Sequence, residues 1–139
     1  MSASTAEPVN FAPYFTGREV RPVEDAALMD RAYQLRHQVY CLECKYLEAA
    51  DYADGRERDD CDAHSAHFVS LNLQGDIAGY VRLVRPDAIQ TFPFQTHCVQ
   101  LLEGVSLPPS DQSAEISRLM VSSRYRRRHG DKLAGVNVD

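Results

Sequence analysis

The sequence contains no tryptophan, only four cysteines and no long hydrophobic run. No apolar stretch approaches the roughly 20 residues that a transmembrane helix requires, so no membrane span is expected. The first ten residues lack the basic start and apolar middle of a secretory signal peptide. We therefore expect a cytoplasmic protein whose cysteines are reduced rather than paired in disulfides.

Positive charge is also in deficit, with 15 Lys and Arg against 20 Asp and Glu. General binding of nucleic acid needs a basic face, so nucleic acid is not an expected partner. The charge is uneven, however, because residues 51–62 are mainly acidic and residues 124–132 mainly basic. These two stretches predict either two sites with different ligands or two solvated loops.

The remaining composition, 44% hydrophobic and 25% charged, is typical of one globular α/β domain. Residues 1–10 are polar and expected to be flexible, and residues 11–139 are expected to form the domain. The clearest element is a helix from Glu24 to about Lys45, with Glu24 and Asp25 in its first turn. Its predicted apolar stripe consists of Leu28, Ala32, Leu35, Val39 and Leu42.

Three or four strands are expected around this helix. Phe11–Val20 is either a short strand or an extended arm. Ala66–Leu73 and Ile77–Arg85 are separated by a short turn and predict an antiparallel hairpin. Residues 86–113 form a long connection, in which Phe92, Phe94 and the stretch Cys98–Leu102 are expected to pack down with a helical turn, and Ala114–Val121 is a further strand.

The last of these strands carries two charges among apolar neighbours, Glu115 and Arg118. Burying either charge without a partner is costly, so both need partners or a cleft. Strict alternation places them on opposite faces, whereas a bulge would bring them onto one face. The alternative is an edge strand whose charges are solvated.

The basic stretch after this strand ends in a glycine before an expected helix. A loop of this kind presents backbone N–H groups and a positive helix end to phosphate, and arginine adds charge-assisted hydrogen bonds. The loop expected to cradle the phosphate is Arg127–Gly130.

A second hypothesis is a zinc-binding module. Cys41 and Cys44, followed by Cys61 and His64, match a formal zinc-ligand spacing. Cys41 and Cys44 fall inside the periodic helix, and no glycine turn follows either pair, so buried free thiols are the simpler interpretation. We expect no bound metal.

Four segments in order resemble N-acyl-homoserine-lactone (autoinducer) synthases. The first carries an arginine and two aromatic residues, and the second carries two acids three residues apart. The third is a strand with a central arginine, and the fourth is a Glu-x-Ser-Arg strand. The matching residues are Arg36, Tyr40 and Tyr46; Asp59 and Asp62; Arg82; and Glu115, Ser117 and Arg118.

A closer resemblance is to acyltransferases associated with PEP-CTERM/exosortase systems, which are related to N-acyl amino acid synthases. It is carried by Tyr40–Cys44, Asp54–Asp59 and Ser122–Arg128. The resemblance implies a bacterial enzyme with a GNAT-like α/β fold, in which a mixed or antiparallel sheet accompanies a long N-terminal helix. The implied reaction moves a fatty acyl group from acyl carrier protein, or acyl-CoA, to an amine or amino-acid acceptor.

The resemblance also implies roles for the matching residues. Arg36, Asp59, Asp62, Arg82 and Arg118 would form the polar side of the site, with Glu115 as general base or amine-orienting carboxylate. Tyr40, Tyr46 and Ser117 would complete the substrate site. Arg124, Arg126, Arg127 and Arg128 would meet phosphopantetheine or the carrier protein, and no cofactor would be bound permanently.

Two departures from the family pattern refine these expectations. The donor-binding loop has Arg127 and Gly130 but ends in Lys132, which favours a carrier-protein donor over coenzyme A. Tyrosines replace the family's other aromatic residues, which leaves the acceptor open. Because the family fold continues beyond the basic stretch, we expect a C-terminally truncated domain that acts either as an acyltransferase or as an inactive interaction domain.

Overall fold

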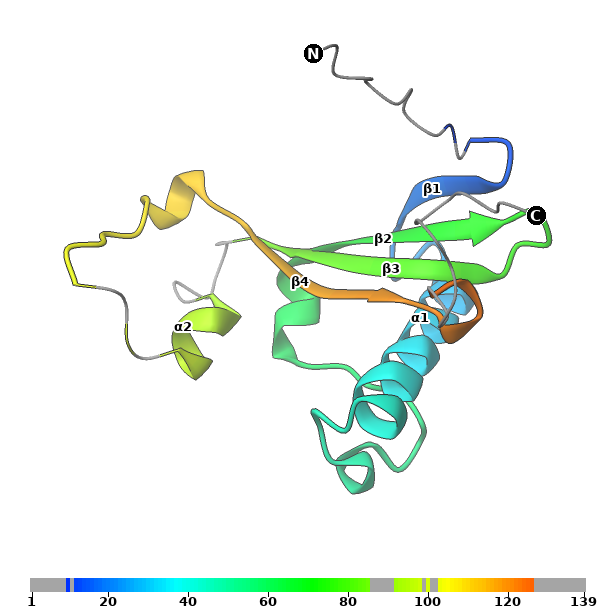
Figure 1. Cartoon of the computed structure of the whole chain (residues 1–139), viewed down its shortest axis with the longest axis horizontal. Coiled ribbons are helices and arrows are strands. Elements are labelled where there is room, and N and C mark those ends of the chain that lie inside the picture. The colour runs from blue at the N-terminus through cyan, green and yellow to red at the C-terminus, as the bar shows by residue number, and fades with distance from the viewer. Residues whose placement is uncertain (1–9, 11, 86–91, 99, 101–102, 127–139) are drawn as a thin grey trace, which may run out of the picture.

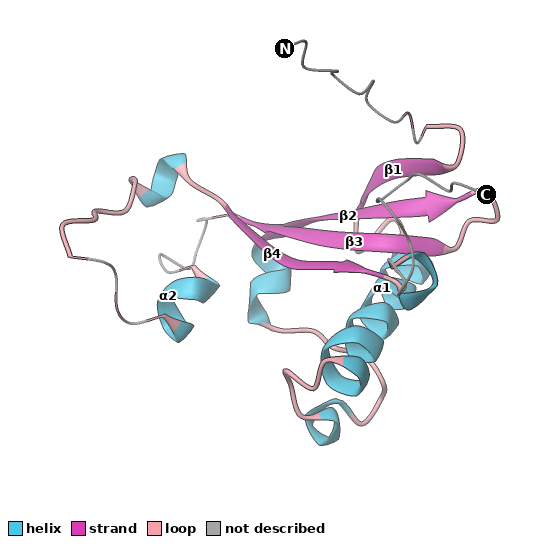
Figure 2. Cartoon of the chain, viewed as in Figure 1, coloured by secondary structure: helices cyan, strands magenta, loops and turns pink. Residues whose placement is uncertain are grey.

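The computed structural model describes residues 10, 12–85, 92–98, 100 and 103–126 (Figure 1). Four antiparallel strands form one sheet in the order β1-β2-β3-β4, and α1 lies against one face of it (Figure 2). The elements are β1 (Phe15–Val20), α1 (Ala26–His37), β2 (Ser65–Asn72), β3 (Ile77–Val84), α2 (Pro93–His97) and β4 (Glu115–Val121). Short 3-10 helices span Ala49–Tyr52, Asp60–His64, Ser110–Gln112 and Ser123–Tyr125.

The predicted hairpin is confirmed as β2 and β3. Their turn contains Gly75 at a φ of +80°, a conformation that glycine adopts without steric cost. Tyr80, Arg82 and Val84 share the buried face of β3, as the period of two predicts. An arginine therefore sits in the middle of a buried strand face, and its charge must be compensated by residues from other elements.

The long helix differs from the prediction in its ends and in its buried face. It begins at Ala26, so Glu24 and Asp25 precede it, and after His37 it continues as a π-helix, Gln38–Glu43. The predicted stripe is wrong at Leu42, which is 47% exposed, because the wider π-turn rotates the residues that follow. The other predicted stripe residues face the core: Ala32 and Val39 are buried, and Leu28 and Leu35 are partly buried against it. Met29, Arg36 and Cys41 are buried as well.

The hydrophobic core lies between α1 and the sheet. It draws residues from every strand and from the helix, so burial of apolar area ties all of these elements together. Its members are Val20, Met29, Ala32, Val39, Val69, Tyr80 and Met120. The polar side chains described below lie on the same face of the sheet.

The predicted bulge in β4 is confirmed. Tyr80 pairs with Met120 and Arg82 with Ser117, so Arg118 and Leu119 together oppose a single residue of β3. Arg118 has a φ of +54°, an uncommon conformation for a residue with a side chain. The bulge turns the Arg118 side chain toward the α1 face, where it is only 18% exposed, which contradicts the alternative of a solvated edge charge.

The connection between β3 and β4 contains one helical turn, α2, at Pro93–His97. This turn contains Phe94, one of the residues around which it was expected, and Pro93 suits the first position of a helix. Of the other expected stretch, Cys98–Leu102, residues 99, 101 and 102 lie outside the described part of the chain. Within the described residues, no helix combines the length and apolar character needed to cross a bilayer.

Candidate active site

Six charged side chains meet between α1, β3, β4 and the segment that leads into β2. Three are arginines and three are carboxylates, so their formal charges balance. They are Arg36, Arg82 and Arg118 with Glu57, Asp59 and Asp62. Five of the six were expected in the polar side of the site from the family resemblance, and the structure brings all five together. The sixth, Glu57, was not expected.

Asp62 holds the inner part of this ion network. Its Oδ1 accepts hydrogen bonds from Arg36 Nη1 at 2.6 Å and Arg82 Nη1 at 2.9 Å. Burial alone would raise the pKa of the Asp62 carboxyl, but Arg36 and Arg82 and the Asp59 backbone N–H hold that pKa below its ordinary value. Both arginines are fully buried, so the free-energy cost of removing their charges from water is offset by these carboxylates.

The spacing of the two acids follows from the 3-10 helix at Asp60–His64. The Asp59 side chain accepts a bond from Cys61 N at 3.0 Å, and Asp62 Oδ2 accepts one from Asp59 N at 2.8 Å. This reciprocal capping fixes both carboxylates on one short turn. Asp59 and Asp62 therefore cap this short helix in addition to pairing with the arginines.

Glu57 is the member of the ion network that the sequence reasoning missed. It is fully buried and joins α1 to β4, accepting bonds from Arg36 Nε at 2.6 Å and from Arg118 Nε and Nη2 at 3.2 and 3.0 Å. The sequence signal that could have identified Glu57 is the alternation of acidic and basic residues over residues 56–59. Glu57 and Asp59 lie on the side of this segment that faces the ion network. Arg56 and Arg58 pair outside the network, with Asp30 and Asp54.

Asp59 and Arg118 form the accessible end of the ion network. Their side chains are 30% and 18% exposed, whereas Arg36, Glu57 and Arg82 are fully buried. Asp59 accepts bonds from Arg82 and Arg118, and Arg82 Nη2 also donates to Ser117 Oγ at 3.0 Å. Among the described residues, Arg118 donates through Nε and Nη2, and its Nη1 donates no hydrogen bond.

Tyrosine rings support two of the arginines. The Arg36 guanidinium carbon lies 5.4 Å from the centre of the Tyr33 ring and 5.6 Å from that of Tyr80. Arg118 lies 5.2 Å from the Tyr40 ring, which packs edge-on against exposed Tyr46. The predicted aromatic pair therefore lies beside the accessible end of the ion network, where cation–π contact stabilises Arg118.

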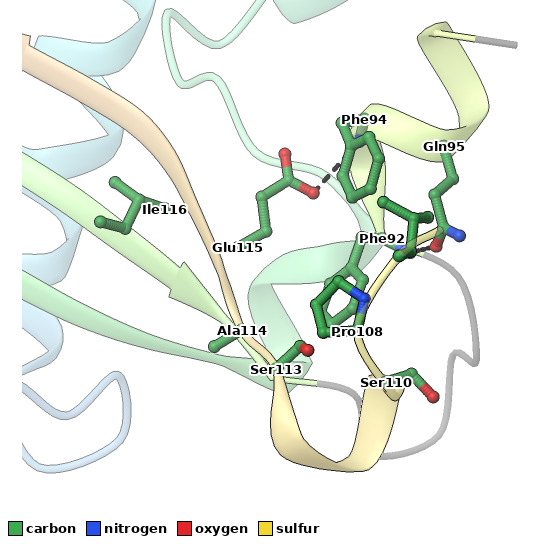
Figure 3. Close-up of a pocket in the computed structure, with 10 residues that line it drawn as sticks. Phe92, Phe94, Gln95, Pro108, Ser110, Ser113, Ala114, Glu115 and Ile116 are labelled. Carbon is green, nitrogen blue, oxygen red and sulfur yellow. Dashed lines mark hydrogen bonds between the residues drawn. The ribbon is translucent and has the colours of Figure 1, made fainter. Parts of the chain in front are cut away.

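Glu115 lies apart from the ion network, at the start of β4. Its Oε2 accepts a hydrogen bond from Phe94 N of α2 at 3.1 Å, as Figure 3 shows. The carboxylate borders a cavity of about 440 Å³ with a mainly apolar lining, in which Phe92, Phe94, Leu107 and Pro108 take part. Alternation places Glu115 and Ser117 on the same face of β4, so the predicted base lies between this cavity and the ion network.

The predicted donor-binding residues are only partly described. Arg124 pairs with Asp76 at 3.5 Å, while Arg126 pairs with Glu43 of the π-helix and donates to Val121 O at 2.8 Å. Arg127, Arg128 and Gly130 lie outside the described residues. The structure therefore ties Arg126 to the π-helix and β4, and it gives the two described arginines, Arg124 and Arg126, different partners.

The zinc hypothesis is not supported. All four cysteines are free, with Cys41 buried and Cys44 exposed. Within the described part of the chain, no group of three or more His, Cys, Asp or Glu side chains is placed to hold a metal ion. Burial raises the pKa of both the Cys41 and Cys61 thiols, which disfavours the thiolate that zinc requires.

Two comparisons with known proteins agree with this geometry. Residues 35–135 match the family model described as an acetyltransferase (GNAT) domain. The crystal structure of the AHL synthase LasI is similar over 78% of this chain, with a TM-score of 0.59 and 22% sequence identity. The match covers 54% of LasI, so this chain spans about half of that protein's length. The predicted GNAT-like α/β fold is confirmed.

Proposed function

The chain belongs to the GNAT acetyltransferase family, in agreement with the predicted enzyme class, and from this premise we propose that it transfers a fatty acyl group from a thioester to an amine. One observation carries the proposal. A single face of β4 runs from an apolar cavity, past the carboxylate of Glu115, to an ion network whose outer arginine has one N–H group that donates to none of the described residues.

The cavity is suited to the acyl chain. Its volume of about 440 Å³ lies within the range of small-molecule pockets, which are mostly apolar with a few polar groups that fix orientation. Phe92 and Phe94 stack with ring centres 6.2 Å apart and line one side. An acyl chain bound here would present its thioester carbonyl toward Glu115 and Ser117.

The reaction needs one base and no covalent enzyme intermediate. The neutral amine nitrogen attacks the thioester carbonyl carbon, the new C–N bond forms, and the C–S bond breaks as the electron pair leaves with sulfur. The proton that the nitrogen loses passes to Glu115 and then to the departing thiolate, so amide and thiol are the products. Glu115 Oε1 accepts no bond from the described residues, which leaves this oxygen free for the amine.

The ion network is suited to a polar acceptor. Arg118 Nη1 would donate to a carboxylate or carbonyl oxygen of the acceptor, with Tyr40 and Tyr46 beside it. Because Glu57 binds the Arg118 guanidinium at two points, the Nη1 group has a fixed direction. This supports an amino-acid acceptor over a simple alkylamine.

The donor and the biological setting are further parts of this proposal. Acyl carrier protein is the favoured donor over acyl-CoA, because Lys132 interrupts the sequence pattern of the donor-binding loop. The resemblance of Tyr40–Cys44, Asp54–Asp59 and Ser122–Arg128 supports a link to a PEP-CTERM/exosortase system. The cytoplasmic location expected from the sequence is also part of the proposal. No resident cofactor is required by the chemistry.

The experiment combines the chain with dodecanoyl thioesters of acyl carrier protein and of coenzyme A, together with the twenty amino acids. Thiol release and N-acyl product are measured for the unaltered chain, Glu115→Gln, and the cavity-filling Ala114→Phe. We expect both variants to lower the rate, while Glu103→Gln, a change at an exposed glutamate, leaves it unchanged. Carrier-protein binding that survives Glu115→Ala and Arg118→Ala, without transfer by the unaltered chain, would instead indicate an interaction domain.

A further inference from the structure

His67 is a buried titratable residue that the proposed reaction does not use. It lies on β2, is 1% exposed, and has hydrogen-bond contacts at both ring nitrogens. Nε2 lies 3.1 Å from the Asp62 carbonyl oxygen, and Nδ1 lies 2.7 Å from the Tyr80 hydroxyl. The ring therefore connects β3 to the 3-10 helix that carries an acid of the ion network.

These contacts fix the form of the imidazole. A backbone carbonyl only accepts hydrogen bonds, so the ring must carry its proton on Nε2 and donate it to Asp62 O. In the neutral ring Nδ1 is then an acceptor, and the Tyr80 hydroxyl donates to it. The same hydroxyl oxygen accepts from Arg36 Nη1 at 3.4 Å, so the chain of donors and acceptors is complete only with neutral His67.

We propose that His67 is a positioning residue, which as the neutral Nε2–H tautomer holds the Asp60–His64 turn against the sheet and thereby keeps Asp62 between Arg36 and Arg82. The proposal depends on the proposed function only for its kinetic readout. Its structural content, the tautomer and its two hydrogen bonds, does not depend on which reaction is catalysed.

Protonation of His67 would break this arrangement. With a proton on Nδ1, both the ring and Arg36 would donate to the Tyr80 oxygen, and the tyrosine proton would lose its acceptor. The new charge would also face two buried arginines. The charged and titratable groups around the ring are Arg36 of α1, Asp62 of the 3-10 helix, and Tyr80 and Arg82 of β3, while β1 presents apolar Val20.

The same surroundings set the direction of the pH dependence. Burial lowers the pKa of His67 below its ordinary value of 6.5, against the opposing effect of Asp62. The unfolded chain therefore takes up a proton near pH 6.5 that the folded protein does not hold. Stability is fully present above pH 6.5 and declines as the pH falls toward the lowered pKa.

The first test is nitrogen-15 NMR of the histidine rings in the full chain at pH 7.5. The proposal requires the proton of His67 on Nε2, and a proton on Nδ1 would overturn it. The second test is urea unfolding between pH 7.5 and 5.5. We expect the decline in the unfolding midpoint to be smaller in His67→Gln and unchanged in His64→Gln, since His64 is not fully buried; equal declines in both variants would contradict the proposal.

The third test is kinetic. His67→Phe removes both hydrogen bonds and is expected to lower kcat for acyl transfer about tenfold, whereas His67→Gln, which keeps one donor and one acceptor, recovers most of the rate. An unchanged kcat in His67→Phe would overturn the proposal. If the unaltered chain transfers no acyl group, the proposed function fails, while the tautomer and the unfolding data still decide the role of His67. If His67→Phe does not fold, His67→Gln carries the kinetic comparison: an acid limb of its pH–rate profile identical to that of the unaltered chain would refute the proposal.

Discussion

Removing the Glu57 carboxylate should destabilise the fold more than any other single change in the ion network. Glu57→Ala removes the acceptors of Arg36 Nε and Arg118 Nε, which now lie 2.6 and 3.2 Å away, while Arg118 Nη2 keeps its hydrogen bond to Asp59. Arg36 is fully buried, so water cannot replace the lost partner. Breaking a buried ion pair from one side costs about 3–5 kcal/mol, a large part of the total stability of a small domain.

The assay is equilibrium urea unfolding followed by far-ultraviolet circular dichroism. A matched control is Glu24→Ala, which removes an exposed carboxylate paired with Arg21 at 3.3 Å and should change the unfolding free energy by less than about 1 kcal/mol. Glu57→Gln should fall between the two, because the amide retains one acceptor oxygen but adds a donor facing two arginines.

The reasoning would be refuted if Glu57→Ala and Glu24→Ala shifted the unfolding midpoint equally at an unchanged m-value. A large loss in Glu57→Ala that persists when Arg118 is also replaced by alanine would assign the effect to Arg36 alone. A double-mutant cycle separates these two contributions.

Three further results are expected. Arg118→Ala should lower kcat/KM for acyl transfer about a hundredfold with an unchanged circular dichroism spectrum; unaltered turnover would remove Arg118 from the site. The pKa of Asp62 is held below its ordinary value of 3.8, so its stabilising effect persists above pH 3.8 and is lost as the pH falls further; acid titration of Asp62→Asn should lack that part of the transition. Met29→Ala should cost about 2–5 kcal/mol of unfolding free energy while exposed Leu73→Ala costs less than about 0.5 kcal/mol, and equal costs would disprove the assigned core.

The sequence predicts the sheet well because its signals are local. The β2–β3 hairpin follows from alternation and a short turn, and the β4 bulge follows from the cost of burying Glu115 or Arg118 without a partner. The convergence of Arg36, Asp59, Asp62 and Arg82 came from motif resemblance. No local rule joins side chains that lie on different elements.

The features that the sequence did not predict depend on tertiary contacts. The change from α- to π-helix after His37 has no signature in apolar periodicity, and it moved Leu42 to the surface. Glu57 was hidden within a charged run whose other members pair outside the ion network, and His67 was unremarkable in a strand. Glu57 gains its role from partners 21 and 61 residues away along the chain, and His67 gains its role from Tyr80, 13 residues away, together with the nearer Asp62.

The measurement that tests the central claim most directly is mass-spectrometric detection of an N-acyl amino acid formed from an acyl thioester by the unaltered chain. The account predicts one amide for each thiol released, loss of both products in Glu115→Gln and Arg118→Ala, and retention of both in Glu24→Ala. Release of thiol with only free fatty acid as its partner product, or amide formation that is insensitive to Glu115 and Arg118, would contradict it.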